Sequence, residues 1–465
     1  MTNDPLLLID KTELVKTIRQ QEQQLEKLRQ ENDSLRNENE KLKQKPDPLK
    51  KKSSQDASGR RSKPPRLWGR KKGHKGSWRP VPEQIDREEP LTLDQCPTCQ
   101  NPLAAPYDFE EHIQEDIIPS RVQVTRYLHY RYWCHHCHAH VVAPHAADEV
   151  PHGHLGPLVL AVMTLLKYHY VLPGNKIKAI LKDLCGLTVS EGGIAQALQR
   201  LGRYLHVETD VILTKVRQAV VKHADETGWK INGVNHWLWA FVNEMWAYYR
   251  IDRSRGAKVV KEVLGNPVPG TLVSDFYSAY GLVGGDQQKC LVHLRRELRE
   301  CRAKGPPGGD PEFEKPYKVL KRILGDADRL SEGRAKLPAV VYKRRVRRLK
   351  DRLIDFACAP FENPHWQRLS KRLLRWQKEI FMFLDKPGVP SHNNTAERAI
   401  RPHVIIRNRS FQNRTDKGAK AHDTLTSLVG TLILQKRNPL EALRKVYPLH
   451  RQQAPAQRHP LLFTA

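Results

Sequence analysis

The chain has 465 residues, enough for roughly two to four domains, and it is strongly basic. Its 79 lysines and arginines outweigh 51 aspartates and glutamates, which gives a formal net charge of +28. Such a charge attracts polyanions, so the composition favours a nucleic-acid partner over a charge excess that only keeps the chain in solution. A membrane partner is disfavoured, because the longest apolar run, residues 155–166, is broken by Gly156 and Pro157 and is too short to span a bilayer.

The N-terminus and the cysteines both favour the cytoplasm. The first ten residues, MTNDPLLLID, lack the basic and apolar regions of a secretory signal. Four of the eight cysteines form two Cys-x-x-Cys pairs, and the other four are scattered. This pattern suits a reducing compartment and a metal site better than a disulfide framework.

A heptad pattern in residues 11–44 predicts a two-stranded coiled coil, and therefore a homodimer or higher oligomer. One core position is taken by Leu14, Gln21, Leu28, Leu35 and Leu42, and the other by Lys11, Ile18, Leu25, Asn32 and Asn39. Buried asparagines of this kind fix the register of a coiled coil. The alternative is a single surface helix.

Residues 45–89 form a linker that is basic and rich in Ser, Gly and Pro, so no packed core is expected there. Its segment PPRLWGRKKGHKG contains Arg70, Lys71 and Lys72, which we expect to contact DNA phosphates or to enter a minor groove. The alternative is a soluble tether.

Residues 90–145 contain the two cysteine pairs, Cys96 with Cys99 and Cys134 with Cys137, separated by 34 residues. Four thiolates in two such pairs predict tetrahedral structural zinc. The intervening residues alternate between apolar and polar, which indicates strands. His135, His136 and His138 are close enough to replace a thiolate, but free surface histidines are the simpler interpretation.

Residues 150–218 are expected to be helical. The segment NKIKAILKDLCGLTVSEGGIAQALQRLGRYL predicts two helices around a Gly-Leu-Thr-Val-Ser turn, with Ser190 as N-cap of the second helix and Glu191 in its first turn. The pair resembles a helix-turn-helix, although many helix pairs that do not bind DNA look the same.

From residue 219 the pattern changes to strands. We expect strands at residues 219–225, 236–243, 246–251, 271–275 and 288–293, with helical segments at 258–264, at 277–280 and after the last strand. This order is that of the ribonuclease H-like fold, in which the first and fourth strands are neighbours. Asp225 and Asp275, fifty residues apart, would then lie about 5 Å apart at neighbouring strand ends.

Residues 303–388 interrupt this core with basic helices. Their apolar residues at helical spacing are expected to be core, namely Trp366, Leu369, Leu373, Trp376, Ile380 and Phe383. The core would resume at residues 389–445, followed by a tail at 446–465. The expected fold class is therefore a multidomain α+β and α/β chain: coiled coil, four-cysteine zinc domain, helical segment, and a ribonuclease H-like mixed sheet with a helical insertion.

Three acidic residues are the candidate catalytic centre: Asp225 in KHADETGW, Asp275 in TLVSDFYSAY and Glu397 in HNNTAERAIRP. Three convergent carboxylates can hold two divalent cations, an arrangement suited to displacement at a phosphodiester. Hard oxygen ligands favour magnesium, with manganese as a substitute. Two alternatives remain: Glu226 could replace Asp225 as the ligand, and Glu397 could form a surface salt bridge.

The motifs DETGW, SDFYSAY, CLVHLRREL, HNNTAERAIRP and RNRSFQNRTDKGA, in this order, resemble those of the insertion-sequence 66 family of bacterial transposases. The module order is also similar, from about residue 11 to 445. The sequence departs from the family pattern at Gly228, where proline is more usual, and in the strongly basic RNRSFQNRT. Neither departure touches the three acids.

The resemblance implies metal-dependent cleavage at transposon ends, followed by attack of the freed 3′-hydroxyl on target DNA. It also implies a bacterial, nucleoid-associated protein that could need element-encoded helper proteins. The rivals are a non-catalytic DNA-binding regulator, a structure-specific nuclease and an RNA-processing ribonuclease. The residues expected to contact DNA are Arg70, Lys71, Lys72, His293, Arg296, Arg398, Arg401, Arg407 and Arg409.

Overall fold

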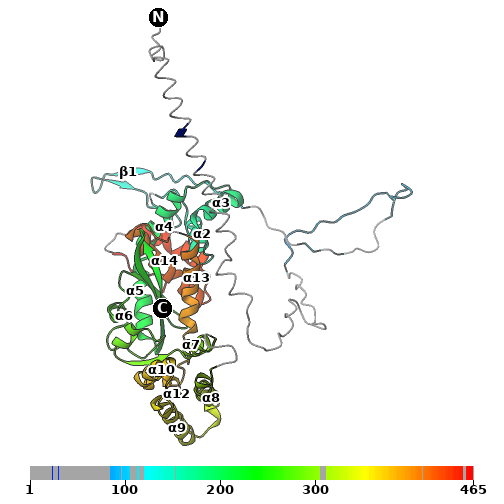
Figure 1. Ribbon diagram of the computed structural model, residues 1–465. Coiled ribbons are helices and arrows are strands. Elements are labelled where there is room, and N and C mark those ends of the chain that lie inside the picture. The colour runs from blue at the N-terminus through cyan, green and yellow to red at the C-terminus, as the bar shows by residue number, and fades with distance from the viewer. Residues whose placement is uncertain are drawn as a thin grey trace. The chain divides into compact units, whose positions relative to one another are not determined.

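The computed structural model is a mixed α/β chain with one five-stranded mixed sheet and many helices (Figure 1). It describes residues 84–95, 97–104, 111, 113–114, 120–151, 153–303, 310–410, 412–453 and 457–463, together with Gln23, Gln24 and Gln30. No helix within these residues is both long and apolar enough to cross a bilayer.

Most of the N-terminal predictions lie outside the described residues. This applies to the basic linker up to residue 83 and to the coiled coil, of which only the three exposed glutamines named above are described, all helical. The zinc-domain segment contributes a two-stranded antiparallel sheet of β1 (Arg131–Cys134) and β2 (Ala139–Val142). Both strands are almost wholly exposed, so among the described residues they contribute little to a hydrophobic core.

The central sheet has the strand order β5-β4-β3-β6-β7. Its strands are β3 (Val221–Ile231), β4 (Val234–Val242), β5 (Ala247–Asp252), β6 (Thr271–Ser274) and β7 (Asp286–Lys289). The first three strands are antiparallel, whereas β6 pairs in parallel with both β3 and β7. The first and fourth strands of the sheet, β3 and β6, are therefore neighbours, as expected.

Two strand boundaries differ from the sequence predictions. Strand β3 was expected to end at Asp225 but continues to Ile231, because Thr227, Trp229 and Ile231 keep the alternation. An Asn232-Gly233 turn, with both residues at positive φ (48° and 80°), then connects β3 to β4 as a hairpin. The strand expected at 288–293 is β7, which ends at Lys289, and the apolar run after it begins helix α7 (Leu291–Ala303).

Helices cover both faces of the sheet, because residues 238–242 of the inner strand β4 are all buried and point alternately to the two faces. Leu238, Ala240 and Val242 face α13 (Asn394–Arg409) and α14 (Asp416–Leu434). The alternate residues Trp239 and Phe241 pack with α5 (Val207–Gln218), α6 (Ala257–Leu264) and the 3₁₀ segment η3 (Ser278–Leu282). Figure 1 shows α13 running alongside the strands.

The predicted helix pair is present as α3 (Gly174–Cys185) and α4 (Glu191–Leu205). Ser190 caps α4, since its Oγ accepts a hydrogen bond from the Gly193 N–H at 3.0 Å. Helix α4 packs closely on α14 at Gly202, where an added Cβ would lie 2.7 Å from the Ala421 Cα. Helices α2 (Pro157–Tyr168) and α15 (Pro439–Gln452) complete this layer.

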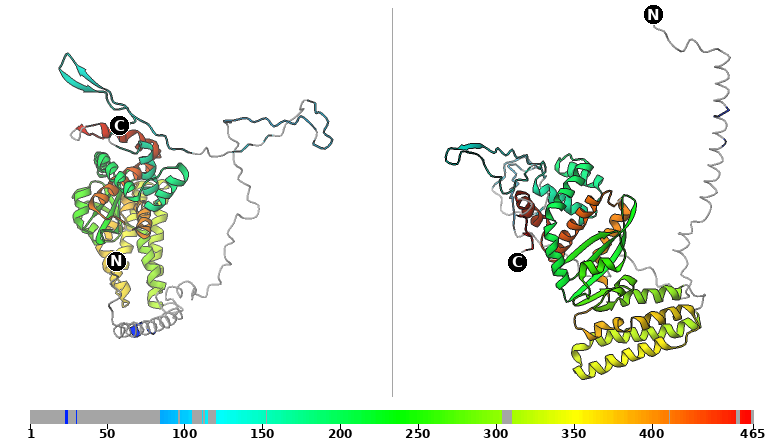
Figure 2. Two further views of the ribbon diagram at one scale, coloured as in Figure 1. Left: turned by 90° about the horizontal axis from the view of Figure 1, so that it is seen from above. Right: turned by 90° about the vertical axis from the view of Figure 1, so that its left-hand side faces the viewer.

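The insertion is a helical bundle (Figure 2), and its core continues into α7 and Val273 of β6. It contains α8 (Pro311–Glu332), η4 (Arg334–Lys336), α9 (Ala339–Cys358), α10 (Pro364–Arg375), α11 (Gln377–Ile380) and α12 (Met382–Asp385). All six apolar residues predicted as its core are buried, from Trp366 to Phe383. Arginines and lysines of α9 occupy the opposite, exposed face.

Candidate active site

Asp225 and Asp275 occupy corresponding positions on neighbouring parallel strands. The β3–β6 register ends with the pair His223 and Val273, and each aspartate follows two residues later in its own segment. Asp275 follows the last residue of β6, and its Oδ1 accepts the Tyr277 N–H at 2.9 Å. Asp225 lies in the middle of β3, on the face that α13 covers, and its Oδ1 accepts the Glu226 N–H at 2.9 Å.

Glu397 comes from the first turn of α13, where the helix dipole favours a carboxylate. Its Oε1 is buried and accepts no hydrogen bond from the described residues. Two side chains approach it loosely: His293 Nδ1 lies 3.5 Å from Oε1, and an Arg296 guanidinium nitrogen lies 3.8 Å from Oε2. The salt-bridge alternative is thus partly realised, but at distances longer than good charge-assisted hydrogen bonds.

The electrostatics of Asp225 show that the carboxylates converge. Burial, followed by the negative charges of Glu226, Asp275 and Glu397, raises the pKa of Asp225 to about 7. A carboxyl group with this pKa is stable either when protonated or when a cation compensates its neighbours. Perturbed carboxyl groups of this kind are concentrated at functional sites.

Asn393 fixes α13 against β3 and was not identified from the sequence as part of the site. Its fully buried side chain donates from Nδ2 to the Ala224 carbonyl at 2.8 Å, and its Oδ1 lies 3.0 Å from His223 Nδ1. Its own N–H points to Cys290 Sγ at 3.1 Å. Burial lowers the pKa of His223 to about 4, so this imidazole is neutral and donates its Nδ1 proton to Asn393.

Replacing Asn393 with alanine is expected to destabilise the protein by about 1–3 kcal/mol, because buried partners at His223 and Ala224 lose their hydrogen bonds. Thermal unfolding of the purified chain measures this effect. Asn394→Ala is the matched control, since Asn394 is the adjacent, only partly buried asparagine at the start of the same helix. Equal melting temperatures for the two variants would contradict the proposed anchoring.

Glu226 points away from this centre. Neighbouring strand residues face opposite sides of a sheet, so Glu226 lies on the side of α6 and η3. There its carboxylate, 2% exposed, pairs with Arg255 at 3.0 Å and accepts the Tyr280 hydroxyl proton at 2.5 Å. Arg255 is itself held between the rings of Trp237 and Tyr277, 4.2 and 4.1 Å from their centroids. The geometry therefore favours Asp225 over Glu226 as the ligand.

The residues expected to contact DNA fall into different environments. His293 and Arg296 face Glu397 and also line an open cleft of about 250 Å³ with Asp275. Arg407 turns inward, donating to Thr227 Oγ1 at 2.8 Å and to the Gly228 carbonyl at 3.2 Å. The exposed arginines of α13 are Arg398, Arg401 and Arg409, whereas Arg70, Lys71 and Lys72 lie outside the described residues.

The cysteines of the predicted zinc site are only partly described. Cys96 lies outside the described residues, and Cys99, Cys134 and Cys137 are free thiols. Hydrogen bonds from the Cys137 N–H, the Cys137 thiol and the His136 N–H lower the pKa of Cys134, as suits a metal-binding thiolate. Among the described residues, two groups of three possible metal ligands have their ligand atoms within 4.8 Å of one another. Neither group contains a cysteine of the two pairs, and each contains a histidine.

Comparison with known proteins identifies the family. A model of the Transposase IS66 family matches residues 152–421, which is more than half of the 465-residue chain. The chain belongs to the IS66 family of transposases. A second model, the zinc-finger binding domain of transposase IS66, matches residues 94–138 and supports structural zinc in this IS66-family chain. The resemblance inferred from the motifs is thus confirmed.

The IS66-family chain is also similar to uncharacterized proteins of Sinorhizobium fredii (strain NBRC 101917 / NGR234). It is 25% identical to y4qI over 363 residues, which cover 70% of this chain and 66% of y4qI, just under two thirds. It is 22% identical to y4jD over 401 residues (79% and 77%) and 23% identical to y4hP over 406 residues (78% and 72%). None of these names specifies an activity.

The donor set of the IS66-family site fits hard divalent cations. All three candidate ligands are carboxylates, the chemistry that magnesium and manganese prefer. The buried Glu397 Oε1 lacks a hydrogen-bond donor among the described residues, and burial together with acidic neighbours raises the pKa of Asp225. Both features are unfavourable for the protein alone, and a bound cation would relieve both.

Proposed function

We propose that this IS66-family chain is a DNA transposase that cleaves at transposon ends and transfers the cut strand into target DNA. The observation that carries the proposal is the convergence of three carboxylates from separate elements: Asp225 on β3, Asp275 after β6 and Glu397 on α13. Burial, followed by the negative charges of Glu226, Asp275 and Glu397, raises the pKa of Asp225 to about 7. Neither a binding protein nor a scaffold needs such an arrangement.

In this proposal the three acids hold two divalent ions, magnesium or manganese. Asp225, Asp275 and Glu397 would hold these ions as their carboxylate ligands. Bound ions of this kind lower the pKa of the attacking water or hydroxyl and neutralise charge on the phosphate. The protein positions the three acids. The parallel pairing of β3 and β6 would place the two aspartates near each other, and the hydrogen bond of Asn393 to β3 would hold the helix that carries Glu397.

The strand order supports a ribonuclease H-like core. Three antiparallel strands are followed by two strands parallel to the first, and the first strand is central. The proposal of this core rests on the same order of strands and helices that the sequence led us to expect. The helical bundle lies in the sequence between β7 and the glutamate, where the resemblance places an insertion.

The DNA partners would be transposon ends and target DNA, which the net charge of +28 favours. Exposed Arg398, Arg401 and Arg409 on α13 are candidates for phosphate contacts near the site. A cleft of about 460 Å³ between α8 and α9 is a second candidate, lined by Arg329, Lys336, Arg345, Arg348 and Arg352 among others. Pairing two ends would require a dimer, for which residues 11–44 are the proposed coiled coil.

The test is cleavage and joining of labelled DNA that carries the element's own ends. The purified full chain is incubated with magnesium, with manganese, or with neither added ion. Cleavage that leaves a 3′-hydroxyl and then joins to target DNA, only with added ion, supports the proposal. Cleavage without joining would indicate a nuclease. End-specific binding without cleavage, also in the presence of the element's helper proteins, would indicate a regulator.

A further inference from the structure

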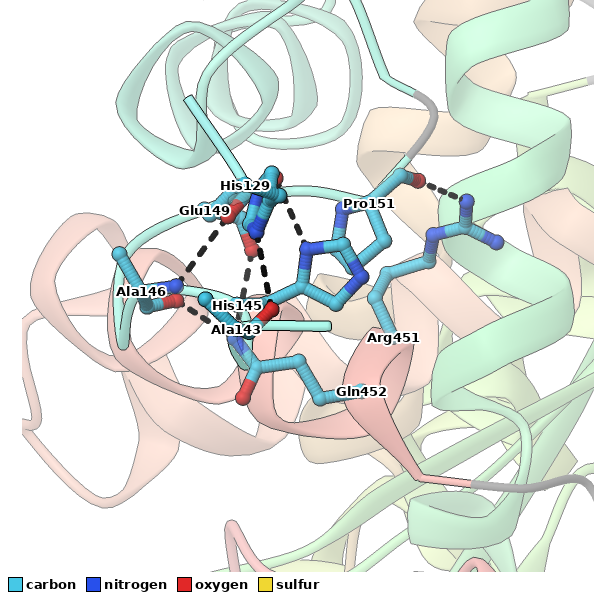
Figure 3. A network of polar contacts seen from close by, with 8 residues as sticks. All are labelled: His129, Ala143, His145, Ala146, Glu149, Pro151, Arg451 and Gln452. Atoms are coloured by element: carbon cyan, nitrogen blue, oxygen red, sulfur yellow. Dashed lines mark hydrogen bonds and ion pairs between the residues drawn. The ribbon is translucent and has the colours of Figure 1, made fainter. Parts of the chain in front are cut away.

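His129, which lies between the two cysteine pairs in the sequence, meets His145 and Glu149 beside helix α15 (Figure 3). His129 Nε2 and His145 Nδ1 lie 3.0 and 2.9 Å from the same oxygen, Oε1 of Glu149. His145 and Glu149 lie outside residues 94–138, the range matched by the zinc-finger model. The Glu149 residue is 8% exposed, so its carboxylate is largely removed from water.

The hydrogen bonds around His129 decide which atoms face one another. His129 Nδ1 lies 3.2 Å from the Ala143 carbonyl oxygen, which can only accept, so Nδ1 carries the proton. In a neutral imidazole the other nitrogen, Nε2, then presents a lone pair to Glu149 Oε1. Two lone-pair atoms at 3.0 Å repel unless a cation or an additional proton lies between them.

The surroundings favour a metal cation. Among the described residues, Glu149 forms ion pairs with the two histidines and with no lysine or arginine. Its second oxygen, Oε2, accepts the Ala146 N–H at 3.1 Å. A carbonyl that orients the far nitrogen of a histidine, and a backbone N–H that orients a carboxylate, are the usual supports of metal ligands.

We infer that His129, His145 and Glu149 hold a zinc ion separate from that of the cysteine pairs. Two imidazoles and one carboxylate form a common ligand set for zinc. Tetrahedral ligands about 2.0–2.1 Å from zinc are roughly 3.3 Å apart, so each histidine nitrogen needs to move away from Glu149 Oε1 by only a few tenths of an ångström. The described residues supply three ligands, which leaves the fourth position to water or to a ligand outside them.

The ion would connect the zinc-finger segment to the helical body. Gln452 of α15 donates from Nε2 to the Ala146 carbonyl at 2.7 Å and to the Glu149 carbonyl at 3.4 Å. Arg451, also on α15, donates to the Pro151 carbonyl (Figure 3). Because β1 and β2 are nearly fully exposed, a metal ion would supply the rigidity that hydrophobic packing does not. This role is independent of the proposed reaction.

The zinc content of the purified full chain, measured by mass spectrometry, tests the inference. The wild type should hold about two zinc ions per chain, and His145→Ala and Glu149→Gln should each hold about one. His145 is 40% exposed, so its truncation should not prevent folding. His154→Ala is the matched control, because His154 is an exposed histidine nearby in the sequence and should leave the content at two.

Zinc-edge X-ray absorption of the same samples identifies the ligands without removing any cysteine. The wild type should show mixed sulfur and nitrogen or oxygen ligands, and His145→Ala should shift towards sulfur alone. An unchanged zinc content and an unchanged spectrum in both cluster variants would overturn the inference. In that case the cluster is an imidazolium–carboxylate ion pair, which a loss of thermal stability with no loss of zinc would demonstrate.

Discussion

Replacing Glu397 with glutamine is expected to reduce cleavage at transposon ends by at least about 1000-fold, roughly 4 kcal/mol of transition-state stabilisation. Glutamine keeps the size of the side chain but removes the negative charge that the proposed metal ions require. Asp225→Asn and Asp275→Asn should cause losses of the same order, because the three carboxylates act as one unit. Single-turnover cleavage of labelled ends in magnesium measures all three effects.

Two controls separate catalysis from folding and binding. Glu441→Gln changes another first-turn glutamate with an arginine partner, at 3.9 Å from Arg444 on α15, and should retain activity within about twofold. Binding of the ends should persist in all three acid variants, because phosphate contacts depend on the basic residues. Normal cleavage by Glu397→Gln would remove this glutamate from the site, and the third ligand would have to be sought elsewhere.

Replacing Asp225 with asparagine is expected to stabilise the protein when magnesium and manganese are absent. The pKa of Asp225 is about 7 in the folded chain against about 3.9 in an unfolded one. Between these values the folded state holds a proton that the unfolded state has released, so wild-type stability falls as pH rises through this window. Above pH 7 the ionised Asp225 lowers the free energy of unfolding by its full amount, about 2–4 kcal/mol. Below about pH 4 this destabilisation disappears, because Asp225 is protonated in both states.

Melting temperatures measured from pH 5 to 8 test the direction of this pH dependence. The buffers contain neither magnesium nor manganese, but also no chelator, so that structural zinc is retained. Asp225→Asn should exceed the wild type by a margin that grows with pH, and added magnesium should stabilise the wild type more than the variant. Asp286→Asn, at a half-exposed ion pair with Lys386, should show no such growth. A margin independent of pH would contradict the raised pKa.

Much of the sheet could be predicted from the sequence because its strands alternate and its acids follow apolar runs. The errors arose where two patterns compete. CLVHL is apolar enough for a strand, but Leu291, Leu294 and Leu298 have the spacing of a helix, and the structure follows them. The end of β3 was misplaced at Asp225, although the Asn232-Gly233 turn signal marks the hairpin further along.

The three acids could be named as candidates from the sequence, but the residues that support them could not. Asn393 meets Ala224 across 169 residues, and Arg255 meets Glu226 across 29, and no local pattern encodes such pairs. A helix-start motif in HNNTAE was the available signal for Asn393. The inward turn of Arg407 likewise depends on the packing of α13 on β3, since in sequence it is indistinguishable from the exposed Arg409.

The hydrogen bond from the Leu291 N–H to the Ser391 carbonyl, 2.8 Å long, closes the chain between these residues into a loop that leaves and returns at one point. The whole insertion lies inside that loop, and Asn393 and Glu397 follow shortly after it, at the start of α13. Closing a longer loop costs only slightly more entropy, about 0.6 kcal/mol per doubling. The size of the insertion is thus decoupled from the spacing of the carboxylates, which leaves this part of the gene free to lengthen, shorten or be exchanged during evolution.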